Sequence, residues 1–169
     1  MLETRDLFLD KARQEDWRDM YERLWRHEES ARYMFWQVTD SEEAARARME
    51  RTIAFEAQEP YALLVYEKVS HRAIGFAGMR QAAPGIYEEI GIALGPDYVG
   101  RGYGRQILNA LTAEARRLGA RTFRACCCSG NVASRALQIS CGFRFVGTEE
   151  KTDERSGETY IMENYEKAL

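Results

Sequence analysis

The chain has 169 residues, of which 45% are hydrophobic and 30% charged, and its formal net charge is -3. This length fits a single domain of residues 1–169, and the apolar fraction supports a packed core, which excludes disordered and fibrous classes. The acidic balance argues against nucleic-acid binding. No apolar run reaches the roughly 20 residues that cross a bilayer, and the first residues lack the apolar segment of a signal peptide. We therefore expect a cytoplasmic protein with no nucleic-acid or membrane partner.

The first third of the sequence predicts a short strand followed by two helices. Leu7 and Leu9 alternate with polar neighbours, as in a strand. A helix that begins near residue 14 has an apolar face formed by Trp17, Met20, Tyr21 and Leu24. A second helix begins near Ser41, carries two glutamates in its first turn, continues to about Gln58 and is closed by Pro60.

The rest of the sequence predicts a mixed sheet. Two strand-like runs, 61–68 and 73–80, are separated by a turn and form an antiparallel hairpin. A third run, 86–94, leads through a glycine-rich turn into a helix at 103–118 and then a strand at 121–128; a crossover of this kind makes the two strands parallel. A short helix at 131–141 and two strands, around 143–150 and 158–166, complete the order.

The cysteines and histidines predict no metal site. Cysteines stand at 126, 127, 128 and 141, a spacing that suits neither a structural zinc site nor a disulfide framework, so reduced thiols are expected. His27 and His71 are far apart and have no companion ligands at metal spacing.

The glycine turn is the first candidate binding site. It contains Gly100, Arg101, Gly102, Tyr103, Gly104 and Arg105, and it lies between a strand and a helix, where free backbone N–H groups and the helix dipole attract an anion such as phosphate. The dinucleotide fingerprint fails because Arg105 and Ile107 stand where glycine is required, and the nucleotide-triphosphatase loop fails because Arg101 and Gly102 replace its Lys and Ser/Thr. A turn that only accommodates the backbone is the alternative.

The segment Val99–Gly104 resembles the pyrophosphate loop (R/Q-x-x-G-x-G/A) of the GCN5-related N-acetyltransferase (GNAT) family, with Val99 at the Arg/Gln position. Residues 131–137 followed by Cys141-Gly142-Phe143 resemble the fourth-helix signature of that family. Residues 2–7 and 89–92 look like the opening and central strands of its ribosomal-protein N-terminal alanine acetyltransferase branch. The resemblance covers essentially the whole chain.

The resemblance implies an α/β (α+β) fold of three layers: a mixed, strongly bent sheet of six or seven strands, with helices on both faces and with its fourth and fifth strands, 86–94 and 121–128, splayed apart. Acetyl-CoA is the implied cosubstrate, with no metal. Its pantetheine arm would bond to the main chain of Ile90, Ile92 and Leu94 and to Asn131, and its pyrophosphate to the loop from Gly100 to Arg105. Arg135 would reach the nucleotide end, or else is a solvated helix residue.

Acetyl transfer to an amine needs a base, because lysine-type and α-amino groups are protonated near neutral pH. The resemblance makes Glu89 the candidate base; Glu88 is its rival on the opposite strand face, and a solvated surface position is the alternative.

Many family members have a tyrosine acid where this chain has Gln138, so Ser134 is the candidate that assists the leaving thiolate, unless it only packs closely. An acyl-cysteine intermediate at Cys126 to Cys128 is the less favoured route.

We therefore expect an acetyl-CoA-dependent N-acetyltransferase that acts on a primary amine, either a protein N-terminus or a small molecule, by direct attack in a ternary complex. The alternative is a non-catalytic acyl-CoA sensor of the same fold. The oligomeric state stays open, with a homodimer as the commonest assembly. Two further groups are candidates for the border of the acceptor site. The aromatic group, which otherwise belongs to the core, is Trp25, Tyr33, Phe35 and Trp36. The acidic group, which otherwise forms a solvated turn, is Glu149, Glu150, Asp153, Glu154 and Glu158.

Overall fold

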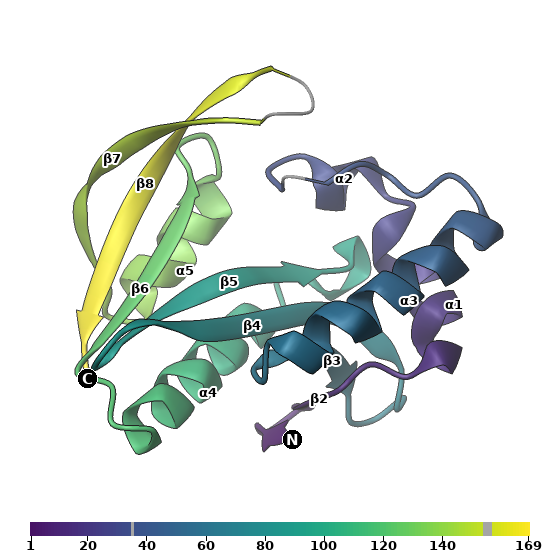
Figure 1. Cartoon of the computed structure of the whole chain (residues 1–169), viewed down its shortest axis with the longest axis horizontal. Helices are drawn as coiled ribbons and strands as arrows, with labels where there is room; N and C mark the ends of the chain where they lie inside the picture. Colours follow the sequence, from purple (N-terminus) through teal and green to yellow (C-terminus); the bar gives the residue numbers. More distant parts are fainter. Residues whose placement is uncertain (35, 154–156) are drawn as a thin grey trace.

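A mixed, open sheet forms the centre of the molecule (Figure 1). The computed structural model describes residues 1–34, 36–153 and 157–169. Within these ranges the sheet has eight strands in the order β1-β2-β3-β4-β5-β6-β8-β7, and only the β5/β6 pair is parallel. The strands are β1 (Leu2–Glu3), β2 (Leu7–Asp10), β3 (Ala62–Glu67), β4 (Ala73–Ala83), β5 (Ile86–Leu94), β6 (Thr122–Cys128), β7 (Arg144–Thr152) and β8 (Thr159–Ala168).

The mixed sheet and the order of elements expected from the sequence are confirmed, and two details differ. The sheet has eight strands rather than six or seven, because Thr4 donates its N–H to the Leu7 carbonyl and turns the opening segment back on itself as β1 and β2. The first helix is broken rather than continuous: a π turn follows α1 where Leu24 and Trp25 both reach the core.

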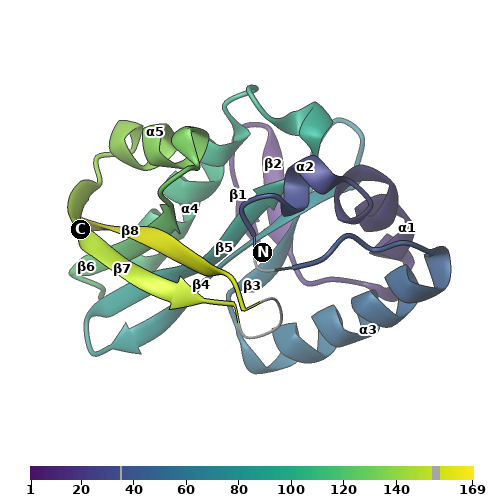
Figure 2. The same ribbon diagram turned by 90° about the horizontal axis from the view of Figure 1, so that it is seen from above.

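The helices and helical turns are η1 (Gln14–Asp16), α1 (Trp17–Met20), η2 (Tyr21–Trp25), α2 (Glu28–Ala31), α3 (Glu42–Gln58), η3 (Pro96–Tyr98), α4 (Tyr103–Arg117) and α5 (Val132–Ser140). Helices α1 and α3 cover one face of the β2–β5 part of the sheet and α4 covers the other, while α5 packs beside β6 (Figures 1 and 2). No helix in the described ranges combines the length and the apolar character needed to cross a membrane.

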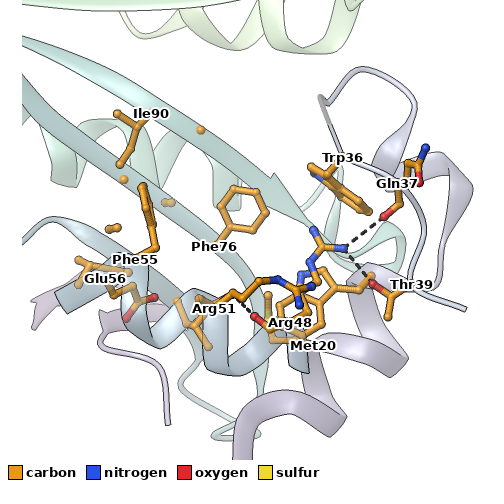
Figure 3. A pocket seen from close by; sticks show the side chains of 18 of the residues that line it. Met20, Trp36, Gln37, Thr39, Arg48, Arg51, Phe55, Glu56, Phe76 and Ile90 are labelled. Carbon is orange, nitrogen blue, oxygen red and sulfur yellow. Dashed lines mark hydrogen bonds between the residues drawn. The ribbon is translucent and has the colours of Figure 1, made fainter. Parts of the chain in front are cut away.

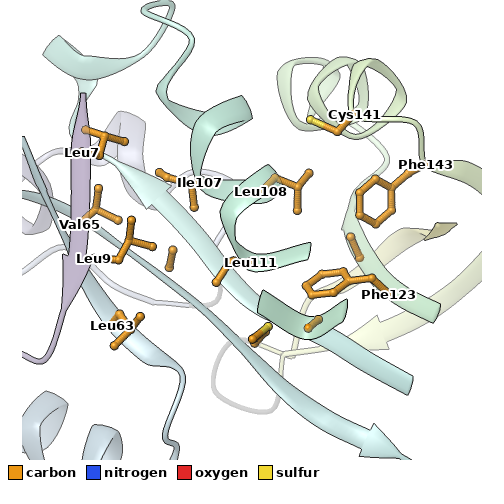
Figure 4. Packing of buried hydrophobic residues seen from close by; sticks show 14 of the residues in the cluster. Leu7, Leu9, Leu63, Val65, Ile107, Leu108, Leu111, Phe123, Cys141 and Phe143 are labelled. Atoms are coloured by element: carbon orange, nitrogen blue, oxygen red, sulfur yellow. The ribbon is translucent and has the colours of Figure 1, made fainter. Parts of the chain in front are cut away.

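Strand β3 shows why both faces of the sheet are covered. All of its residues are buried, and because successive side chains alternate between faces, Leu63 and Val65 join one core cluster while Leu64 and Tyr66 join the other. In the first cluster Ile107, Leu108 and Leu111 of α4 pack on the sheet, as Figure 4 shows. The second cluster lies under α1 and α3, with Trp17, Met20, Leu24 and Met49.

The C-terminal end of α3 is attached to the sheet by polar contacts. Lys11 donates to the carbonyl oxygens of Glu56 in the last turn of the helix, Glu59 just past its end and Ala62 at the start of β3, at 2.7, 2.9 and 3.0 Å, and so joins the helix end to the sheet. The Glu56 carboxylate accepts the Ala12 N–H at 2.7 Å and is 4% exposed. Burial raises the pKa of Glu56 to about 7.

The Glu56 site predicts that stability falls as pH rises. The folded state keeps this carboxyl protonated up to pH about 7, whereas the unfolded chain ionises near 4.5, so the free energy of unfolding decreases between these values and levels off above them. Glu56→Gln keeps an oxygen for the Ala12 N–H and removes the buried charge. We expect the variant to be more stable than the parent by about 1–3 kcal/mol at pH 8 and equal to it near pH 4.5. Urea unfolding across this pH range measures the difference; parallel pH profiles for the two proteins would contradict it.

Candidate active site

The parallel pairing of β5 with β6 stops partway along the two strands. Its register runs from Ile86 opposite Thr122 to Glu88 opposite Arg124 and goes no further, although β5 continues to Leu94 and β6 to Cys128. A bulge adds to the divergence, because Gly91 pairs with Gly78 and Glu89 with Met79, which leaves Ile90 as the extra residue. The strands therefore splay as expected, and the β5 main chain beyond Glu88 turns unpaired groups toward a gap.

A cavity of about 780 Å³ occupies this gap. Its walls come from β5, β6, the start of α4 and the face of α5, so it joins segments that are far apart in the sequence. Ile90, Ile92 and Leu94 lie along one side and Cys126, Cys127 and Cys128 along the other. The remaining candidate residues on its wall are Glu89, Gly100, Gly102, Tyr103, Gly104, Arg105, Asn131 and Ser134.

The glycine turn opens α4 with unsatisfied donors. Within the described part of the chain, none of the main-chain N–H groups from Gly100 to Arg105 has a hydrogen-bond partner. Gly102 is the N-cap residue with φ 78°, and Gly100 has φ 76°, a left-handed conformation that favours glycine. A cluster of free N–H groups at a helix N-terminus is suited to a phosphate.

Glu67, at the end of β3, holds this turn in place. Its carboxylate accepts the Tyr103 hydroxyl at 2.9 Å and the Ser70 hydroxyl at 2.7 Å, and the Arg101 guanidinium lies 3.6 Å away. Arg101 also lies over the Tyr98 ring and is outside the wall of the cavity, whereas the exposed Arg105 is part of that wall. Of the two arginines expected at an anion, Arg105 has the freer side chain.

Glu89 is the first residue past the last β5/β6 pair, and its half-buried carboxyl group lines the cavity. It has no hydrogen-bond partner among the described residues, and burial raises its pKa to about 8. Glu88 is instead paired with Arg80 at 2.8 Å across the β4/β5 ladder. Of the two glutamates, Glu89 is the one that faces the gap.

A polar cluster forms the α5 side of the gap. Asn131 caps α5 by accepting the Ser134 N–H at 3.0 Å. Gln138 is 1% exposed and donates to the Cys126 carbonyl at 3.2 Å and to the Ser134 hydroxyl oxygen at 3.4 Å, while its own Oε1 has no partner in the described residues. Gln138 thus orients Ser134 and leaves one buried acceptor beside the cavity.

A second cavity, of about 560 Å³, lies between α3 and the sheet (Figure 3). Trp25, Trp36, Phe55 and Phe76 form its aromatic walls, and Arg48 and Arg51 of α3 line it as well. Ile90 and Gly91 line both this cavity and the one between β5 and β6, so the two cavities are neighbours at the β5 bulge, next to Glu89.

The comparison with protein families agrees with this geometry. A family model described as an acetyltransferase (GNAT) domain matches residues 6–144. The chain belongs to the GNAT acetyltransferase family. The family expected from the glycine loop and the fourth-helix signature is thus confirmed. No curated protein matches the chain.

Solved structures share the GNAT fold of this chain at low sequence identity. A GNAT-family acetyltransferase from Bacillus anthracis has a TM-score of 0.82 at 18% identity, covering 99% of this chain and 97% of that one. The RimL ribosomal L7/L12 α-N-protein acetyltransferase, in complex with coenzyme A as a disulfide with one of its cysteines, has a TM-score of 0.78 at 21% identity (98% and 96%). The microcin C7 self-immunity acetyltransferase MccE, in complex with acetyl-CoA and AMP, has a TM-score of 0.81 at 19% identity (98% and 94%).

The other residues singled out in the sequence lie at several different places. The Arg135 guanidinium donates to the Glu163 carboxylate at 2.6 and 2.9 Å and to the Ser129 carbonyl at 2.7 Å, so it joins α5 to β8 and does not line the cavity. The contact of Arg135 with the nucleotide end stays a prediction. Trp25 and Trp36 line the second cavity, and Tyr33 lines the cavity between β5 and β6. Phe35 and Glu154 lie outside the described residues.

The cysteines at the gap are poor nucleophiles. Burial raises the pKa of the thiols of Cys126, Cys127 and Cys128, that of Cys127 to about 11, which keeps them protonated near neutral pH. An acyl-cysteine intermediate is therefore disfavoured. No cluster of three or more potential metal ligands is found among the described residues.

Sequence reasoning missed three residues that matter to the site. Glu67 gives no signal, since an acidic residue before a turn is ordinary. The cavity-facing stripe of α3, which includes Arg48 and Arg51, is detectable only as a helical spacing that solvated arginines also show.

The glycine turn predicts a specific loss of coenzyme binding. Gly102→Glu puts a carboxylate among the free N–H groups, so we expect calorimetry to show that coenzyme A binding is weakened by about 100-fold or more, since each opposed charge-assisted contact is worth about 1.5–3 kcal/mol. Gly119→Glu is the matched control: it adds the same side chain at φ 88°, at the far end of α4, with no atom within 4 Å of the new Cβ. Equal losses in both variants would show that backbone strain, rather than the anion site, causes the effect.

Proposed function

We propose that the protein is an acetyl-CoA-dependent N-acetyltransferase in which residues 1–169 act as one domain and a primary amine, on a protein N-terminus or a small molecule, attacks the acetyl group directly in a ternary complex. The observation that carries the proposal is the position of Glu89. A lone carboxyl group whose burial raises its pKa to about 8 lies where the β5/β6 gap meets the second cavity. A base with a pKa near the working pH is what removal of an ammonium proton requires.

The residues around the gap suit the two ends of acetyl-CoA. The free N–H groups from Gly100 to Arg105 would hold the pyrophosphate, with the Arg105 side chain beside them. The unpaired main chain of Ile90, Ile92 and Leu94 would bond to the pantetheine amides like an added strand. Asn131 uses its carbonyl oxygen to cap α5, so its amide NH₂ group is the part available to the pantetheine arm.

In the proposed step the amine nitrogen bonds to the acetyl carbon, the carbon–sulfur bond breaks and Glu89 takes the proton that the amine loses. Unpaired N–H groups of β5 face the gap and would stabilise the oxyanion. The Ser134 hydroxyl, held by Gln138, would donate a hydrogen bond to the departing thiolate. A thiol pKa near about 8.5 makes that thiolate a tolerable leaving group with little further help.

Glu89→Gln tests the base. We expect kcat to fall by about 10²–10⁴-fold with coenzyme A affinity unchanged, because the amide cannot accept the proton. We expect kcat/KM of the parent protein to rise with pH and to level off above about 8, as Glu89 ionises, and the variant to lose this inflection. Glu88→Gln is the control, since Glu88 bonds to Arg80, and should keep the parent pH profile. A Glu89→Gln enzyme with near-parent kcat would exclude Glu89 as the base.

An acceptor screen separates catalysis from sensing. Release of coenzyme A thiol is followed with N-terminal peptides, polyamines, aminoglycosides and free amino acids. Acetylation of any of these amines supports an N-acetyltransferase. Tight acetyl-CoA binding without turnover across the whole panel would instead identify the protein as a non-catalytic acyl-CoA sensor.

A further inference from the structure

Arg48 has an unusual position in the second cavity. Its guanidinium lies between two indole rings, 4.7 Å from the centre of Trp25 and 4.5 Å from that of Trp36. Only Nη1 donates hydrogen bonds to described residues: to the Gln37 carbonyl at 3.3 Å and to the Thr39 hydroxyl at 3.0 Å (Figure 3). These bonds fix the plane of the group and leave the donors on Nε and Nη2 without partners in the described structure.

The charge of Arg48 is not paired with any carboxylate of the described residues, since its polar partners there are the Gln37 carbonyl and the Thr39 hydroxyl. Two acidic residues do line the cavity. The Glu56 carboxylate accepts a hydrogen bond from the Ala12 N–H, and Asp40 is exposed and forms no ion pair with Arg48. Burial, and then the charge of Arg51, lowers the pKa of Arg48 to about 10. A partly desolvated arginine without a carboxylate is costly unless an anion joins it.

The face of α3 that lines the cavity supports this interpretation. Ala44, Arg48, Arg51 and Phe55 recur at helical spacing and line the cavity together, while Ala45 and Met49 pack in the core. Trp36, whose ring the Arg48 guanidinium lies over, lines the same cavity.

The cavity is placed to hold the acceptor. It meets the β5/β6 gap at Ile90 and Gly91, next to Glu89, and its volume of about 560 Å³ lies in the range of small-ligand sites. A molecule that fills it has its reacting amine at the β5 bulge and its remaining groups among the aromatic rings and the two arginines.

We propose that the acceptor carries an oxyanion, a carboxylate or a phosphate, on the same molecule as its primary amine, and that Arg48, assisted by Arg51, binds this group. This inference rests on the proposed function, because it assigns the second cavity to the acceptor. Guanidinium binds both oxyanions through paired hydrogen bonds, and the flanking indole rings keep water away and strengthen the contact. Arg48 is thus a specificity-determining residue that takes no part in proton transfer.

Matched acceptors test the charge. Three pairs differ in a single anionic group: phenylalanine and phenylalaninamide, alanyl-glutamate amide and alanyl-glutamine amide, and 2-aminoethyl phosphate and ethanolamine. They separate an α-carboxylate, a side-chain carboxylate and a phosphate. In at least one pair we expect the anionic member to have a kcat/KM about tenfold or more above the neutral one, the value of one charge-assisted contact. Equal or better use of the neutral member in all three pairs would overturn the inference.

Variants of α3 locate the effect. For the pair that shows a preference, Arg48→Met should lower the ratio of the two kcat/KM values toward one. It should do so by raising KM for the anionic member, while kcat/KM for the neutral member changes by no more than about twofold. Arg51→Gln, which leaves the bonds of Arg48 intact, should reduce it by a few fold. Arg46→Gln is the control, because Arg46 pairs with Glu42, lies over Trp17 and does not line the cavity. If Arg48→Met slows both members equally, Arg48 only fastens the loop at Gln37 and Thr39, and the inference is wrong.

A binding measurement distinguishes this inference from the proposed function. Trp25 and Trp36 flank Arg48, so an anionic ligand in the cavity should change tryptophan fluorescence of the protein loaded with coenzyme A, and the Arg48→Met variant should lose this change. Arg48-dependent binding of the anionic member without any acetyl transfer would reject the proposed function and retain the anion site. Acetyl transfer without preference for the anionic member, or without dependence on Arg48, would reject the anion site alone.

Discussion

The arrangement of both cavities depends on where the β5/β6 hydrogen bonds stop. Up to Glu88 and Arg124 the two strands satisfy each other, and beyond this pair the main chain of β5 is bonded only on its β4 side. A buried main chain cannot remain unsatisfied at low cost, so the divergence creates a demand for hydrogen bonds that an amide-containing ligand can meet. The bulge at Ile90 occurs at the same place and turns the strand so that one short segment borders both cavities.

The same divergence explains the electrostatics. Glu89 follows the last pair directly, so its carboxyl group is enclosed by two strands without a hydrogen-bond donor from either, and its charged form is disfavoured. The glycine turn shows the opposite case, with donors that have no acceptor in the described part of the chain. Unsatisfied groups of opposite character thus lie along one cavity. In the proposed function this polarity would orient a ligand that is anionic at one end and reacts at the other.

Much of this architecture follows from sequence pattern, because the elements that build the gap have strong local signals. The glycines at 100, 102 and 104 and the apolar periodicity of α4 predict the turn and the helix behind it. Other details depend on distant partners: Arg135 has the position expected of a ligand-binding residue, and in the structure its guanidinium pairs with Glu163 on β8. The bulge at Ile90 depends on how β5 pairs with Gly78 and Met79 of β4, so the sequence of β5 alone does not predict it. The stripe at Arg48 becomes visible only when α3 lies on the sheet and the indole rings enclose it.

Gly104 has a consequence for the width of the gap. A Cβ atom at this position would lie 3.0 Å from Cδ2 of Leu137, so α4 and α5 approach each other because one of them lacks a side chain there. The glycine turn and the α5 cluster consequently form a single stiff wall. Replacing Gly104 by alanine would require the Leu137 side chain to give way by a few tenths of an ångström without altering a polar atom, so the missing side chain sets how closely α5 can approach the start of α4.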